Sequence, residues 1–201
     1  QCQETAGCTG CTKFGVCGKS PELAGVQDLL IYVTKGLSEV LTKARKEGIE
    51  VSKEVNHLVT LNLFTTITNA NFDDEVFYNR INKTLDIKEE YLEKLTNKEN
   101  LSEATLWNSK DREEQDEKSK VVGVLSTKNE DIRSLRELTI YGLKGLAAYM
   151  KHANELNYDD EEINAFMQEA LDSTLKDLSV DELVGLALKT GEFGAKGMAL
   201  L

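Results

Sequence analysis

The cysteines of this sequence are the residues whose type and spacing could do chemistry. All four lie close to the N-terminus of the 201-residue chain: Cys2, Cys8, Cys11 and Cys17. Thiolates gathered at this density can hold a metal ion or an iron–sulfur cluster, or they can pair as disulfides. The N-terminal segment is therefore the candidate site, and the three chemistries differ in the spacing that they require.

The spacing favours an iron–sulfur cluster over zinc and over disulfides. Disulfides are typical of small secreted chains, whereas we expect no secretory signal here, and the chain has ample apolar residues for a core. Structural zinc sites usually combine two C-x₂-C pairs, and only Cys8 and Cys11 form such a pair. The glycines among the cysteines would let the backbone wrap closely around a cluster, and they are Gly7, Gly10, Gly15 and Gly18. Zinc and disulfides remain open alternatives.

The residues around the cysteines match a known pattern. Eight residues separate Cys2 from Cys11, and five separate Cys11 from Cys17. Further matches lie in the rest of the chain, at residues 27–32, 129–138 and 141–145. With these motifs the chain resembles the hybrid-cluster protein (prismane) family of hydroxylamine reductases, which opens with C-x₂-C-x₈-C-x₅-C. The resemblance implies that Cys2, Cys11 and Cys17 are ligands of a cubane [4Fe–4S] cluster.

The sequence departs from the family pattern at two positions. The first cysteine of the pattern would lie three residues before Cys2 and is absent from this chain. Cys8 lies inside the eight-residue spacer, where the pattern has no cysteine. We interpret Cys8 as a bystander, with a role as substitute fourth thiolate as the alternative. The sequence therefore predicts weak or incomplete occupancy by the cluster.

The resemblance implies an oxidoreductase that is longer than this chain. It would reduce hydroxylamine to ammonia, with nitric oxide as another small nitrogen-oxide substrate, in an oxygen-poor cytoplasm. Its hybrid iron–sulfur–oxygen cluster would be enclosed by two α/β domains, with all ligands beyond Leu201. The cysteine loop would then relay electrons from a redox donor protein. We expect no catalytic residue in these 201 residues and no turnover by them alone.

A different class of function stays open from the residues themselves. A stand-alone helical module could use the same cysteine loop to bind structural zinc or to contact a partner protein. Iron and sulfide after anaerobic purification would favour the first interpretation, and zinc alone would favour the second.

The composition excludes some partners. A formal net charge of −11 would repel nucleic-acid backbones and anionic membranes, so neither is expected as a partner. No apolar run approaches the ~20 residues that span a bilayer. The chain starts without Met and stops on the apolar stretch 198–201, so we expect it to be a fragment of something longer.

The elements that must position the cysteines are helical. The predicted fold is all-α, with two antiparallel three-helix bundles preceded by a cysteine-rich cluster-binding loop. The predicted segments are the loop at 1–19, a first bundle at 20–96, a charged connector at 97–128 and a second bundle at 129–201.

Capping signals and glycines set the predicted helix boundaries. Ser20 and Pro21 start the first helix, and Ser179 with Glu182 forms a capping box for the last. The glycines at 191, 194 and 197 are expected to interrupt that last helix. The stretch 121–125 could form a strand.

The remaining chemical side chains favour structural roles. His57 and His152 are the only histidines and are far apart in sequence, so they indicate no metal site. Trp107 is expected to be a hydrophobic anchor. Arg133 and Arg136, three residues apart on one helix face, are expected to pair with acids at 130 or 137.

Overall fold

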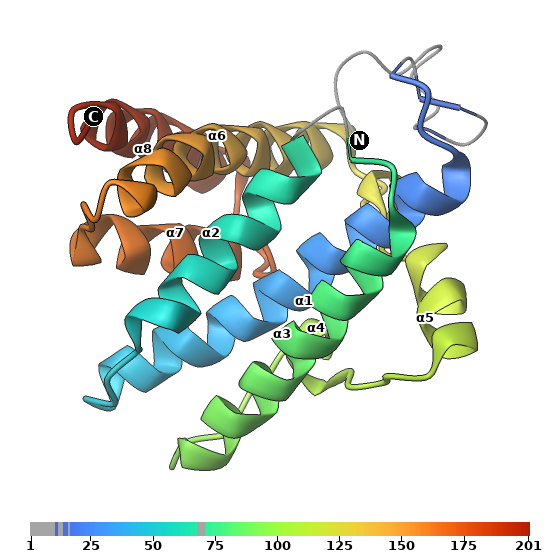
Figure 1. Ribbon diagram of the computed structural model, residues 1–201, viewed down its shortest axis with the longest axis horizontal. Coiled ribbons are helices and arrows are strands. Elements are labelled where there is room, and N and C mark those ends of the chain that lie inside the picture. Colours follow the sequence, from blue (N-terminus) through green and yellow to red (C-terminus); the bar gives the residue numbers. More distant parts are fainter. Residues whose placement is uncertain (1–10, 12–13, 16, 68–70) are drawn as a thin grey trace.

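The computed structural model describes residues 11, 14–15, 17–67 and 71–201 (Figure 1). Within these ranges it contains eight α-helices, one short 3₁₀ helix and no strand, so the predicted all-α class is confirmed. The elements are α1 (Pro21–Lys46), α2 (Lys53–Ile67), α3 (Asp74–Lys94), α4 (Glu103–Leu106), α5 (Arg112–Ser119), η2 (Val124–Ser126), α6 (Glu130–Glu155), α7 (Glu161–Ser173) and α8 (Val180–Met198). The predictions for Cys2 and Cys8 lie outside the described residues.

Side-chain caps start the helices where the sequence predicts. The Ser20 hydroxyl accepts a hydrogen bond from the backbone N–H of Leu23 at 3.2 Å. The capping box before α8 is complete, because Ser179 and Glu182 each accept from the other's backbone N–H. At the other end of α1, Gly48 takes the left-handed φ of +76° that ends the helix.

The helix α1 lies at the centre of the fold. It contacts α2, α3, α4, α5 and α7, and Figure 1 shows it running diagonally between them. Its apolar residues are buried along its whole length, from Leu23 to Ala44. A helix that is apolar on most sides is stable only when other elements surround it. The cysteine loop is therefore attached to the most enclosed helix of the described chain.

Two hydrophobic clusters fill the interior. The larger contains side chains from both halves of the sequence, among them Leu41 of α1, Leu63 of α2 and Leu143 of α6. The smaller joins the first half of α1 to α3 and includes Phe77 and Ile81. Because the larger cluster crosses from one half to the other, the division into two three-helix bundles stays a prediction.

The charged segment between α3 and α6 folds onto α1 as short helices. The helix α5 is mostly exposed, as its composition indicates, but Gln115 and Ser119 are buried. The helix α4 approaches α1 closely at Gly36, where an added Cβ would meet the carbonyl oxygen of Ala104 at 2.3 Å. The stretch that could have been a strand instead forms a turn and the 3₁₀ helix η2.

The prediction that glycines interrupt the last helix is wrong. The helix α8 continues through Gly191, Gly194 and Gly197 to Met198. A Cβ on Gly197 would meet Leu146 Cδ1 at 2.6 Å, so glycine lets α8 pack closely against α6. This tertiary contact outweighs the ~1 kcal/mol by which a glycine disfavours a helix relative to alanine.

Candidate functional site: the cysteine loop before α1

Backbone hydrogen bonds fold the end of the cysteine loop into a tight turn. Gly15 N–H donates to the carbonyl oxygen of Lys19, and Gly18 N–H donates to that of Gly15, both at 2.8 Å. Gly18 has a φ of +90°, a conformation that side-chain-bearing residues rarely adopt. The turn leads directly into the Ser20 cap, so its geometry is tied to the start of α1.

Two of the predicted ligands converge on this turn. A Cβ built on Gly15 would lie 3.2 Å from Cys17 Sγ and 3.6 Å from Cys11 Sγ. Both sulfur atoms therefore lie against the same α-carbon, on the side where any larger residue would place its side chain. Cys17 is exposed and Cys11 is half-buried. Two thiols beside a backbone without a Cβ fit the wrapping that a thiolate-held cluster requires.

The loop is also anchored to the segment that precedes α3. Lys19 is buried, and its ammonium lies 5.1 Å from the centroid of the Phe72 ring. The same ring lies 3.9 Å from the position of a Cβ on Gly18. A cation over an aromatic face is favourable. The contact therefore holds together two segments that are more than fifty residues apart in sequence.

The described residues contain part of the predicted ligand set. Cys11 and Cys17 are brought together, while Cys2 and Cys8 lie outside the described ranges. Within those ranges there is no group of three or more His, Cys, Asp or Glu residues placed to hold a metal ion. The ligand assignment for the loop thus stays a prediction that the Gly15 geometry supports.

The other chemical side chains have structural roles. His57 Nε2 lies 3.8 Å from Asp159 Oδ2, and the His152 ring meets Phe64 edge-on at 6.1 Å. The Trp107 ring contacts Tyr32 at 6.5 Å, which confirms it as an anchor.

The pairing predicted for the two arginines of α6 is wrong. Arg133 donates to the carbonyl oxygen of Thr127, and Arg136 donates to that of Lys176. Both arginines reach backbone carbonyl groups in turns outside α6 instead of the acids of their own helix.

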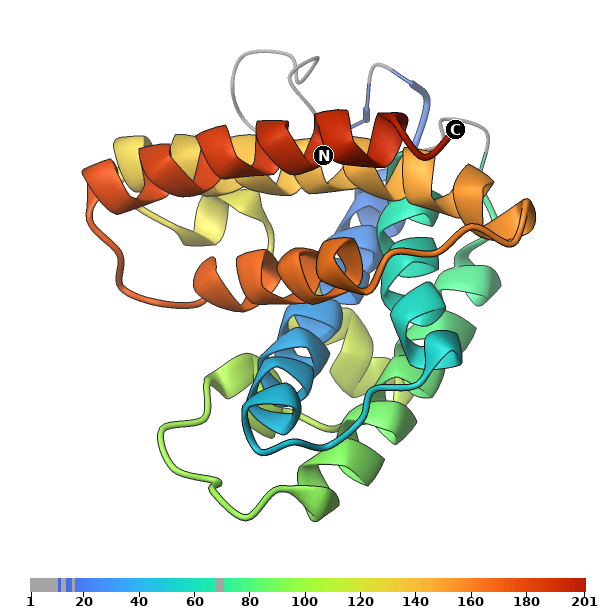
Figure 2. The same ribbon diagram turned by 90° about the vertical axis from the view of Figure 1, so that its left-hand side faces the viewer.

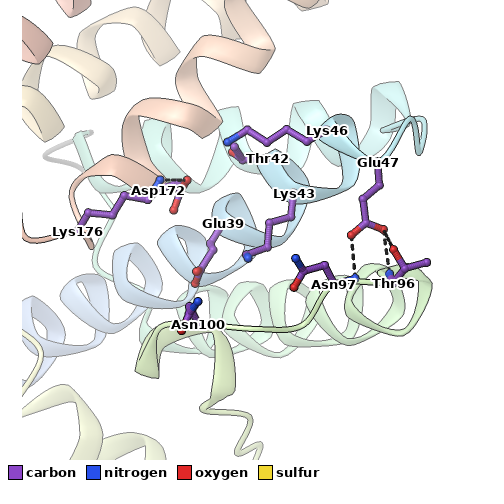
Figure 3. Close-up of a pocket in the computed structure, with 10 residues that line it drawn as sticks. All are labelled: Glu39, Thr42, Lys43, Lys46, Glu47, Thr96, Asn97, Asn100, Asp172 and Lys176. Atoms are coloured by element: carbon purple, nitrogen blue, oxygen red, sulfur yellow. Dashed lines mark hydrogen bonds and ion pairs between the residues drawn. The ribbon is translucent and has the colours of Figure 1, made fainter.

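A cleft that the sequence did not predict lies beside the C-terminal end of α1 and has a volume of about 480 Å³ (Figure 3). Its acids are already engaged, since Glu47 accepts from the backbone N–H groups of Thr96 and Asn97 and Asp172 pairs with Lys176. Burial raises the pKa of the Asp172 carboxyl. These contacts hold the loop after α3 and the end of α7, so the cleft is part of the scaffold.

The buried charges around α4 were likewise not predicted from the sequence. Glu39 of α1 accepts from Ser102 N–H at 3.0 Å, at the start of α4. Lys88 of α3 is 1% exposed, and it donates to the carbonyl oxygens of Ala104 and Trp107 at the other end. The acid and the base therefore each satisfy backbone groups at one end of this single-turn helix.

Comparison with known proteins places the chain in a family. The model of the Prismane/CO dehydrogenase family matches residues 1–201. The chain is 55% identical to a hydroxylamine reductase of Clostridium perfringens and 52% identical to one of Desulfovibrio desulfuricans, over its whole length in both cases. It covers 38% and 37% of these relatives, respectively, and corresponds to their N-terminal part. From the match along its entire length, the chain belongs to the Prismane/CO dehydrogenase family.

Proposed function

We propose that this chain is the N-terminal, electron-relaying part of an oxidoreductase that reduces hydroxylamine to ammonia. The observation that carries the proposal is the convergence of Cys11 and Cys17 on Gly15, in a chain whose relatives are named hydroxylamine reductases. No helix of the described residues is long and apolar enough to cross a membrane. The cytoplasmic location that we propose rests on the resemblance to the family.

The cysteine loop is the proposed cluster site. Cys2, Cys11 and Cys17 would supply thiolates to a [4Fe–4S] cluster, with Cys8 as the alternative fourth thiolate. Such a cluster supplies one-electron transfer when bound. The absence of a Cβ at Gly15 leaves room beside the two described sulfurs, and the backbone hydrogen bonds from Gly15 to Lys19 and from Gly18 to Gly15 enclose Cys17 in the turn.

The substrate chemistry is proposed to belong to the C-terminal part that the relatives possess. This chain would provide no catalytic residue, and its role would be to take electrons from a redox donor protein. The hybrid iron–sulfur–oxygen cluster and the small nitrogen-oxide substrate would bind in the C-terminal part. We therefore expect the isolated 201 residues to give no hydroxylamine reduction with a chemical electron donor. Ammonia formation by the isolated chain would contradict this assignment.

Anaerobic reconstitution with iron and sulfide tests the ligand assignment. The unsubstituted chain should bind a cluster at low or incomplete occupancy. Cys11→Ser and Cys17→Ser should each abolish what is bound, whereas Cys8→Ser should retain it. Iron, acid-labile sulfide and zinc are measured per chain, together with visible absorbance.

The outcomes separate the alternatives for the loop. A chain that retains zinc alone contradicts the electron-relay proposal and supports the structural-zinc module. Loss of the cluster in Cys8→Ser identifies Cys8 as the substitute ligand. A stable four-iron cluster held by the four cysteines of this chain contradicts the expected low occupancy.

A further inference from the structure

The helix α8 carries apolar residues on two faces. One face packs inward through Leu183, Thr190 and Gly197. A second row follows the helical spacing of three and four residues, and it consists of Val184, Leu188, Gly191, Ala195 and Met198. All five are exposed, with Leu188 at 68% and Met198 at 54%. A surface helix normally has polar residues on its outward side, so this second row needs an explanation.

Two lysines of α8 lie on a different side. Lys189 is placed over the Phe166 ring of α7 at 5.2 Å, and Lys196 pairs with Asp160 at the start of α7. The side of the helix that carries these lysines is therefore turned towards α7, and the exposed apolar row lies away from it, bordered by the exposed acids Asp181 and Glu192.

The helix α6 extends the same apolar surface. It lies beside α8 and runs in the same direction (Figure 2). Gly142 is opposite Thr190, and Leu146 is opposite Gly197. The exposed residues of α6 near this contact are Leu138 at 58%, Tyr141 at 48% and Tyr149 at 37%. We call the combined surface the α6–α8 face, and define it by Leu138, Tyr141, Tyr149, Val184, Leu188 and Met198.

Glycines within the face have no role in the contacts of this chain. A Cβ on Gly145, Gly191 or Gly194 would meet no atom within 4 Å. Alanine would favour the helix more than glycine does. These glycines would be explained by another segment that approaches the helix backbone closely, just as Gly197 allows α6 to approach α8. Large apolar side chains beside bare backbone form a surface suited to close packing.

We propose that the α6–α8 face is the docking surface for the C-terminal part of the family polypeptide. The relatives extend well beyond the matched region, because this chain covers 38% and 37% of them and corresponds to their N-terminal part. The face includes the last helix of the described chain, so the polypeptide that follows in the relatives emerges at the face itself. A short connection keeps the entropic cost of folding back onto α6 and α8 small.

The test compares each substitution in two settings. One is the 201-residue chain alone, and the other is this chain followed by the C-terminal part of the Clostridium perfringens relative. Leu188→Glu should leave the melting temperature of the isolated chain unchanged, because the side chain is 68% exposed there. In the longer protein it should lower the melting temperature and divide a single calorimetric transition into two. Leu106→Glu is the matched control, since Leu106 is 63% exposed and lies outside the face.

A second substitution gives opposite signs in the two settings. Gly191→Leu should raise the melting temperature of the isolated chain, because leucine favours the helix and the space is open. In the longer protein it should lower the melting temperature, because the new side chain obstructs close approach.

Three results would overturn the proposal. The first is that Leu188→Glu and Gly191→Leu each change the melting temperature equally in both settings. The second is that the unsubstituted longer protein melts in two separate transitions. The isolated chain could also form a dimer that Leu188→Glu dissociates, which would assign the face to a second copy. None of these readouts involves metal, so failure here is distinguishable from failure of the cluster assignment.

Discussion

At the residue scale, the bare α-carbon of Gly15 is the feature most closely tied to the proposed chemistry. Gly15→Ala would place a methyl group 3.2 Å from Cys17 Sγ and 3.6 Å from Cys11 Sγ. We expect this change to lower the iron bound per chain after anaerobic reconstitution, with unchanged helical circular dichroism. Gly185→Ala is the control, because a Cβ there meets nothing within 4 Å. Equal iron content in the two variants would count against the role of Gly15.

Lys88 gives a prediction in which pH is the variable. Burial lowers the pKa of its ammonium from 10.5 to about 8 in the folded chain. Between these values the unfolded chain binds more protons, so the free energy of unfolding should rise as the pH increases from 8 to 10.5. The total rise is on the order of 3 kcal/mol. The free energy of unfolding of Lys88→Met, measured with urea across the same pH range, should lack this rise. If the free energy changed with pH in parallel in the two proteins, the prediction would be wrong.

At the element scale, the approach of α4 to α1 depends on the absence of a side chain at Gly36. Gly36→Ala would bring a Cβ to 2.3 Å from the carbonyl oxygen of Ala104, so one backbone must move. We expect the free energy of unfolding to fall by roughly 1–3 kcal/mol, the usual cost of overpacking. Chemical denaturation measures the loss. Gly145→Ala, with open space at its Cβ, should instead be neutral or stabilising.

The elements also show what could be predicted from the sequence. Helix starts were predictable because Ser20 and Ser179 accept hydrogen bonds from N–H groups three residues away. The continuity of α8 was not predictable, because it depends on the contact between Gly197 and Leu146, which lies fifty-one residues earlier. The partner of Arg136 was also set by a distant turn, because Lys176 lies forty residues later in the chain.

The candidate site likewise combines features that the sequence predicts with features that it does not. The spacing of Cys11 and Cys17 identifies them as a pair with shared chemistry. Their position against Gly15 arises from a turn whose bonds the sequence does not specify. In the sequence, buried charges such as Glu39 and Lys88 cannot be distinguished from surface residues. They are buried because segments that come later in the chain pack over them.

At the scale of the whole molecule, the larger hydrophobic cluster joins both halves of the chain. We therefore expect the isolated 201 residues to unfold as one unit. The single tryptophan, Trp107, packs against the smaller cluster, so its fluorescence reports on that cluster, whereas far-UV circular dichroism reports on the helices of the whole chain. Urea curves recorded by the two probes should coincide. Separate midpoints would instead support two bundles that fold independently.

The contact between Lys19 and Phe72 has a consequence for how the cysteine loop responds to its surroundings. The loop is held on one side by the start of α1 and on the other by the ring before α3. Any event that displaces Phe72, such as a protein binding at the start of α3, would loosen the turn that carries Cys17. The lifetime of a metal in the loop would then serve as a local sensor of contacts made at the surface of the neighbouring helix.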